Sequence, residues 1–273
     1  MESAQTPQRL TIQLLGDFRV SVGSRAIHER EWTLRKVKSL VKLLALAPHH
    51  RLHREHIIDR LWPDIGSEGG ANNLHKVLYV ARRILEPDLP PRRTSSYLQL
   101  RHDMLLLQAP DGLWTDVEAF LAAARAAHAW RTPQAYQEAL RLYTGDLVPE
   151  DHYEDWVIAH RERLSGLRVT LLVELAGAQE QAGELSAAIE TLQQAVASDP
   201  VHEEAQGMLM RLLVQAGRRH LALRQYQALR AALQRELEVE PDVSLQALYQ
   251  DIRGGHPAQG SRSTLLRVVN EQT

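Results

Sequence analysis

Two short segments near the N-terminus alternate apolar and polar residues. Leu10–Leu14 and Phe18–Val22 follow a period of two, and Gly23-Ser24 supplies a turn after the second segment. Alternation of this kind is typical of a strand with one buried face. The pattern predicts a small antiparallel sheet at the start of the chain.

From Trp32 the apolar residues change to helical spacing. One helix is predicted to end near Ala47, and a second carries Ile57–Trp62 and is closed by Pro63. Residues 64–70, with the sequence DIGSEGG, have turn composition. We expect them to form an exposed acidic loop before a third helix.

The third helix is predicted over 71–85. Its apolar residues share one sector at about 100° per residue, and the opposite sector holds no carboxylate. In DNA complexes Asn pairs with adenine, Arg with guanine, and Lys, His or Tyr with phosphate oxygens. A polar helix face by itself is more often plain solvated surface, so the elements on either side must determine whether this helix reads DNA. The groove-facing residues that we predict are Asn72, Asn73, His75, Lys76, Tyr79, Arg82 and Arg83.

Two more strand-like segments follow the third helix. Tyr97–Leu100 and Met104–Leu107 flank a short polar turn and predict a hairpin. Three helices followed by a hairpin are the element order of a winged helix. Near this wing we expect three arginines to neutralise DNA phosphates, namely Arg92, Arg93 and Arg101.

The charge distribution agrees with a polyanion partner. The net charge of -2 combines +6 over residues 1–108 with -8 over residues 109–273. A basic N-terminal half favours nucleic acid, although such an offset alone is equally compatible with a solvated surface.

The second half has helical periodicity nearly throughout. After Ala109–Gly112, apolar residues keep helical spacing to Gly254, which suggests about seven helices. Gly183 and Ala188 are echoed 34 residues later by Gly217 and Ala222, which is the period of a tetratricopeptide repeat. Stacked helix pairs of this type bury a shared core and present a concave surface to other proteins.

Several kinds of chemistry lack the residues that they need. The chain has no cysteine and no GxxxxGK[ST], HExxH or GxSxG motif. The histidines at positions 49, 50, 53 and 56 are dense, but no carboxylate pattern completes a ligand set, so phosphate contact or a solvated surface is favoured. We therefore expect no enzyme activity, no metal and no cofactor.

No signal for export or membrane insertion is present either. The first ten residues lack a basic start and an apolar stretch. No window approaches the roughly 20 apolar residues that a membrane helix needs. We expect a cytoplasmic protein without membrane contact.

The fold class predicted from these patterns is mainly α, with an N-terminal winged helix-turn-helix carrying small β-sheets, followed by an all-α, TPR-like repeat. The expected boundaries are a flexible N-terminus at 1–9, the DNA-binding domain at 10–108, a linker at 109–113, the repeat domain at 114–253 and a tail at 254–273.

The order of short motifs between residues 10 and 253 resembles the SARP family of antibiotic regulatory proteins, which join an OmpR-type winged helix to a bacterial transcriptional activation domain (BTAD). The first half carries Trp32, Leu61-Trp62-Pro63-Asp64, Asn73-Leu74, Arg82-Arg83 and Tyr97. The second half carries Asp116-Val117, Phe120, Ala139-Leu140, Tyr143-Thr144-Gly145-Asp146-Leu147, Met208-Leu209-Met210, Gly217-Arg218 and Ala222.

Two departures from the family pattern concern DNA recognition. Ser95-Ser96 stands where the family commonly has a glycine pair before the wing tyrosine. The third helix contains Asn, His and Tyr where many relatives carry more arginine. The operator sequence therefore does not carry over from relatives.

The resemblance implies a sequence-specific regulator that binds double-stranded operator DNA, and an activator that works with RNA polymerase holoenzyme. It also implies a homodimer or a head-to-tail assembly on direct repeats. The third helix would enter the major groove while the wing touches the adjacent backbone or minor groove. We further expect residues 64–70 to contact polymerase, because an exposed, acidic, glycine-rich loop is unsuited to DNA.

Two alternatives remain open. A repeat-based adaptor would keep the winged helix as a protein-interaction or structural module, against which the Arg82-Arg83 pair and the base-compatible face argue. A sensor subunit would bind a ligand in the helical repeat and control a partner ATPase, which requires a concave pocket in the second half.

Overall fold

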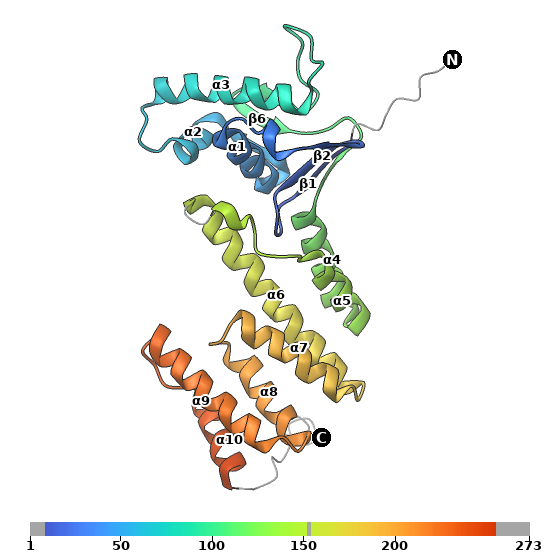
Figure 1. Ribbon diagram of the computed structural model, residues 1–273, viewed down its shortest axis with the longest axis vertical. Helices are drawn as coiled ribbons and strands as arrows, with labels where there is room; N and C mark the ends of the chain where they lie inside the picture. Colours follow the sequence, from blue (N-terminus) through green and yellow to red (C-terminus); the bar gives the residue numbers. More distant parts are fainter. Residues whose placement is uncertain (1–8, 152–153, 255–273) are drawn as a thin grey trace, which may run out of the picture. The chain divides into compact units, whose positions relative to one another are not determined.

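The computed structural model describes residues 9–151 and 154–254 and contains two compact units (Figure 1). The first unit runs through Trp130 and again over Gln134–Gly166. The second holds Arg131–Pro133 and the described chain from Leu167 onward. Residues 1–8 and 255–273, expected to be a flexible terminus and a tail, lie outside the described residues.

A four-stranded sheet opens the first unit. Its strands are ordered β3-β2-β1-β7, with β1 antiparallel to β2 and parallel to β7. The bounds are β1 (Leu10–Gln13), β2 (Arg19–Val22), β3 (Arg25–Ile27) and β7 (Leu113–Thr115). The antiparallel pair is the one predicted, whereas β7 starts within the expected linker at 109–113.

Three helices and a second sheet complete a winged helix, as predicted. The helices α1, α2 and α3 pack on one another, with the β5–β6 hairpin against α1 and α3 (Figure 1). The helices are α1 (Arg35–Leu46), α2 (Arg54–Leu61) and α3 (Ser67–Leu85), and the sheet β4-β6-β5 comprises β4 (Arg51–His53), β5 (Leu98–Arg101) and β6 (Met104–Leu107).

The third helix starts earlier than its sequence suggests. α3 begins at Ser67, so the loop expected at 64–70 is wrong over its second half. Glu68 lies in the first turn, where a carboxylate is favourable to the helix dipole. A Cβ on Gly70 would come within 2.2 Å of Ile58 Cγ2. Gly70 therefore allows α2 and α3 to cross closely. The turn-like composition of residues 67–70 was misleading, because these residues belong to α3.

The first unit continues well beyond the wing. It takes in α4 (Asp116–Trp130), most of α5 (Pro133–Leu142), the short η3 (Pro149–Asp151) and the start of α6 (Asp155–Gln181). The buried Asp116 carboxylate accepts hydrogen bonds from the backbone amides of Leu14 and Leu15 at 2.9 Å. These bonds fix the beginning of α4 to the end of β1.

The Tyr143–Leu147 motif docks on the same end of β1. Thr144 Oγ1 donates to the Leu15 carbonyl at 2.6 Å, and the Gly16 amide donates to the Asp146 carbonyl at 2.8 Å. A Cβ on Gly145 would lie 3.0 Å from Gly16 Cα, so two backbones meet here with no room for side chains. The motif is thus fixed to β1 within the first unit, with Leu147 buried and Thr144 and Asp146 exposed.

The second unit is a run of helices that pack in sequence. They are the later part of α6, α7 (Leu185–Ser198), α8 (Glu203–Gln215), α9 (Arg219–Glu236) and α10 (Val243–Gly254) (Figure 1). Seven α-helices therefore lie between Asp116 and Gly254 of the described chain, in agreement with the sequence.

The 34-residue period is present in the backbone itself. Gly183 and Gly217 have φ of +80° and +73°. Each glycine amide donates to the carbonyl three residues earlier, and the next amide donates to the carbonyl five residues before it. This is the Schellman motif, repeated at the same offset. Ala188 and Ala222 follow at equal spacing, both fully buried, which confirms the TPR-like repeat.

The described helices also bear on the membrane question. None of them combines the length and the apolar character needed to cross a lipid bilayer.

Candidate nucleic-acid interface

The exposed face of α3 is built from residues spaced three or four apart. Asn72, Lys76, Tyr79 and Arg83 are all exposed, and 67% of the surface of Tyr79 is accessible. His75 is exposed beside them and Asn73 is half-buried. The opposite face is anchored by an apolar row, consisting of Leu74, Val77, Leu78, Ala81, Ile84 and Leu85.

Arg82 differs from the adjacent Arg83 in its burial, because Arg82 is half-buried whereas Arg83 is exposed and donates to the Leu89 carbonyl at 3.0 Å. The Arg82 Nε donates to the Leu98 carbonyl at 3.0 Å, which ties α3 to the first wing strand. Burial lowers the pKa of Arg82 while nearby Glu86 opposes that shift. The guanidinium remains charged at neutral pH, and its geometry is that of a brace between helix and wing.

The serine pair that replaces the family's glycines fastens the start of the wing. Ser95 is fully buried, and its Oγ accepts the amides of Tyr97 and Leu98 at 3.1 and 3.2 Å. Ser96 donates to Glu86 through both its amide and its hydroxyl, at 3.0 and 3.1 Å. A glycine pair would lack the hydroxyl bonds. In this chain the bonds from Ser96 to Glu86 hold the start of the wing to the end of α3.

The three predicted wing arginines do not form one cluster. Arg92 and Arg93 are exposed on the segment after the C-terminal end of α3. Arg101 ends β5 beside the hairpin turn, where its guanidinium contacts Gln99 Oε1. The structure thus places cations near both ends of a helix about 28 Å long.

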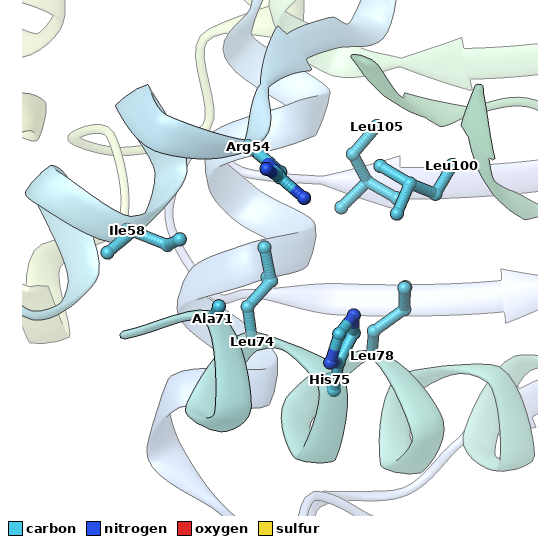
Figure 2. A pocket seen from close by; sticks show the side chains of 8 residues that line it. All are labelled: Arg54, Ile58, Ala71, Leu74, His75, Leu78, Leu100 and Leu105. Atoms are coloured by element: carbon cyan, nitrogen blue, oxygen red, sulfur yellow. The ribbon is translucent and has the colours of Figure 1, made fainter. Parts of the chain in front are cut away.

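A small hollow lies between α2, α3 and the wing (Figure 2). Its volume is about 10 Å³, roughly room for one water molecule. Figure 2 shows Arg54 and His75 at this hollow, with leucines of α3 and of the hairpin around it. The Arg54 amide donates to the Asp103 carbonyl at 2.8 Å, and its Nε lies 3.2 Å from Asp103 Oδ1. The wing turn is thereby fixed to the start of α2.

Sequence reasoning missed Arg54 as a candidate phosphate contact. It is exposed at the first position of α2, and His56 of the same helix and Arg51, the first residue of β4, are exposed as well. A cation at the start of a helix is unfavourable to the helix dipole, which favours anions there. The His53-Arg54 pair at the start of α2 could therefore have indicated from the sequence that these side chains meet an anion such as a DNA phosphate.

The four neighbouring histidines do not form one cluster, although the rings of His53 and His56 lie edge to face with their centroids 6.0 Å apart. His50 Nδ1 lies 3.1 Å from the Ala45 carbonyl and its Nε2 lies 3.2 Å from Glu118 Oε1. His53 Nδ1 accepts the Glu55 amide at 3.3 Å and so caps α2. Over the described residues no three His, Asp or Glu side chains are grouped to hold a metal ion.

The fold defines a class of protein. A winged helix joined to a TPR-like repeat is the architecture of a winged-helix transcriptional regulator whose second part is a bacterial transcriptional activator domain. Residues 115–253 match the model of the bacterial transcriptional activator domain family. The chain belongs to this family and is a SARP-type transcriptional regulator.

Two relatives illustrate the similarity. The transcriptional regulator RedD of Streptomyces coelicolor is 28% identical over 238 residues, which cover 85% of this chain and 68% of RedD. EmbR of Mycobacterium tuberculosis, solved in complex with a low-affinity phosphopeptide, superposes with a TM-score of 0.72 at 22% identity. That match covers 92% of this chain and 66% of the EmbR chain, so this chain spans less than two thirds of EmbR.

Proposed function

We propose that the protein is a sequence-specific DNA-binding regulator that inserts α3 into the major groove of its operator. The observation that carries this proposal is the exposed face of α3 with Asn72, Lys76, Tyr79 and Arg83, which is free of carboxylates from Ala71 to Leu85; Glu68, one turn before Asn72, marks the N-terminal limit of the reading face. Amide and guanidinium groups read base edges, while lysine and tyrosine bind phosphates.

The wing takes a supporting role in this proposal. Arg101 beside the hairpin turn and Arg54 at the start of α2 are exposed cations of elements adjoining α3. They would neutralise backbone phosphates on either side of the groove that α3 enters. Arg92 and Arg93 would do so near the other end of the helix. His75 and Asn73 flank the reading face, and Arg82 holds the wing in register with it.

The test is binding of the full chain to a fragment of its own upstream region across a salt series. Specific binding with a steep salt dependence is expected, since released counterions set the slope. A Lys76→Ala/Arg83→Ala variant should lose most of the affinity, whereas Arg125→Ala, an exposed arginine of α4, serves as the matched control. Binding no tighter than to a random sequence, by a folded protein, would favour the adaptor alternative.

The second part of the proposal is that the DNA-bound protein activates transcription through RNA polymerase. The part of the predicted 64–70 loop that lies before α3, residues 64–66, is exposed and includes Asp64, which suits a protein partner better than DNA. Asp64→Lys should keep operator affinity and lower transcription with purified holoenzyme, with Asp88→Lys as control. Loss of operator binding in the Asp64 variant would contradict this role. Assembly as a dimer or head-to-tail pair would appear as a second bound copy on direct repeats.

A further inference from the structure

A larger hollow lies in the first unit, between the end of α2 and the start of α6. As the described residues define it, its volume is about 590 Å³, which falls in the range of roughly 300–1,000 Å³ typical of small-molecule sites. Two tryptophans line it, Trp62 from the end of α2 and Trp156 from the first turn of α6. Neither the DNA-reading face nor the wing contributes to it.

One aromatic wall of this hollow is held by its side chain. Trp156 Nε1 donates to Glu154 Oε2 at 3.2 Å, and Glu154 Oε1 lies 3.3 Å from an Arg35 nitrogen. At the other wall it is the backbone that is fixed, because the Trp62 amide donates to the Ile58 carbonyl at 2.8 Å and closes α2. A ring that is already oriented loses little freedom when a ligand binds.

The charges around the hollow select for a cation. Lys36 is paired with Glu154 at 3.8 Å, so these two charges offset each other. Among the remaining lining groups, three carboxylates face one guanidinium. The carboxylates are Asp59, Asp64 and Asp155, and the guanidinium is Arg60. Within the described chain none of the three carboxylates is in an ion pair, which leaves an excess of negative charge beside two indole rings.

We propose that this hollow binds a small organic cation with an aromatic body. Indole faces attract cations through the ring quadrupole, and the carboxylates offset the charge that the ligand brings out of water. Ile65 also lines the hollow, one residue before the N-cap of α3. An occupant therefore contacts the segment that sets the start of α3, which makes the hollow an effector site of the regulator.

The experiment uses the full chain without DNA, so its outcome is independent of the proposed DNA binding. Benzyltrimethylammonium is the probe, with benzyl alcohol as the neutral analogue and phenylacetate as the anionic one. Indole ¹⁵N–¹H signals of the five tryptophans are followed during titration. The expected result is a saturable shift of the Trp62 and Trp156 signals with the cation, and at least about tenfold weaker effects with the two analogues.

Two sets of variants test separately what the carboxylates and the tryptophan rings contribute to binding of the cation. Asp59→Asn/Asp64→Asn changes exposed side chains only and should weaken binding of the cation about tenfold, whereas Asp88→Asn should not. Trp62→Phe should weaken it further, against Trp130→Phe, a change of an exposed tryptophan outside the hollow. Equal binding of all three probes, or a cation response that leaves Trp62 and Trp156 unmoved, would overturn the proposal.

Discussion

The ammonium of Lys42, on α1, lies 2.6 Å from the carboxylate of Asp151, on η3, and both side chains are almost completely buried. Glu150 adds a second contact at 2.7 Å, and the ammonium stands 4.7 Å from the centre of the Phe18 ring. An ion pair of the first unit thus joins segments more than a hundred residues apart in the chain.

Breaking this pair from one side should destabilise the first unit strongly. Lys42→Met leaves the buried Asp151 carboxylate with only the more distant Arg35, at 3.8 Å, and should cost up to about 3–5 kcal/mol. Lys42→Met/Asp151→Leu should recover much of that loss. All five tryptophans lie in the first unit, so urea titration followed by their fluorescence measures it. Lys38→Met is the control, because its partner Glu29 is exposed and the change costs about 1 kcal/mol or less.

Arg82 and Arg83 should behave differently although they are adjacent. Arg83→Ala removes an exposed cation and should reduce the salt slope of operator binding by about one. Arg82→Ala removes the bond to the Leu98 carbonyl, so it should speed amide exchange in the wing and lower the unfolding free energy by about 1 kcal/mol. Its salt slope should stay near that of wild type. An equal slope change in both variants would show that Arg82 also meets DNA.

Gly70→Ala should destabilise the crossing of α2 and α3. The added Cβ would sit 2.2 Å from Ile58 Cγ2, and overpacking of this kind costs about 1–3 kcal/mol. In an Ile58→Ala background the same Gly70→Ala change should cost less, as measured by urea unfolding. Gly166→Ala is the matched control, because a Cβ there meets no neighbouring atom and should stabilise α6 by up to about 1 kcal/mol. A neutral Gly70→Ala would mean that the helices move apart freely.

A fragment that stops at residue 108 should fold poorly. It lacks β7, the Asp116 carboxylate that holds the amides of Leu14 and Leu15, and the Thr144 hydroxyl bonded to the Leu15 carbonyl. A fragment that ends with α6 at Gln181 keeps all of these. NMR signal dispersion and operator binding of the two fragments give the comparison. If the shorter fragment matches the longer one in both, the clamp on β1 is dispensable.

His160 should make the first unit less stable in mild acid. Burial lowers the pKa of His160, and Arg163 and Arg60 lower it further. The unfolded chain then takes up this proton first, so the unfolding free energy should fall as pH drops below about 6.5 and level off once the folded form is protonated. NMR titration of the ring should show a higher pKa in Arg60→Gln. His160→Asn should remove this part of the pH dependence.

The sequence and the structure agree where local pattern settles the outcome. The period-two segments became β1 and β2, the helix predicted over 71–85 became most of α3, and Gly183 and Gly217 became equivalent helix ends. The groove-facing assignment of the α3 side chains remains a prediction, as does that of the wing arginines. The domain boundaries drawn at 108 and 114 also remain predictions, while the first compact unit extends to Gly166.

What the sequence determined by itself is the order and type of the elements, because helical and strand periodicity, caps and turn residues are local properties. The tertiary structure alone decided that Gly70 packs against Ile58, that Arg82 braces the wing, and that Lys42 finds Asp151. These relationships depend on which surfaces meet in the folded chain. Local sequence patterns do not indicate which distant residue a side chain will contact.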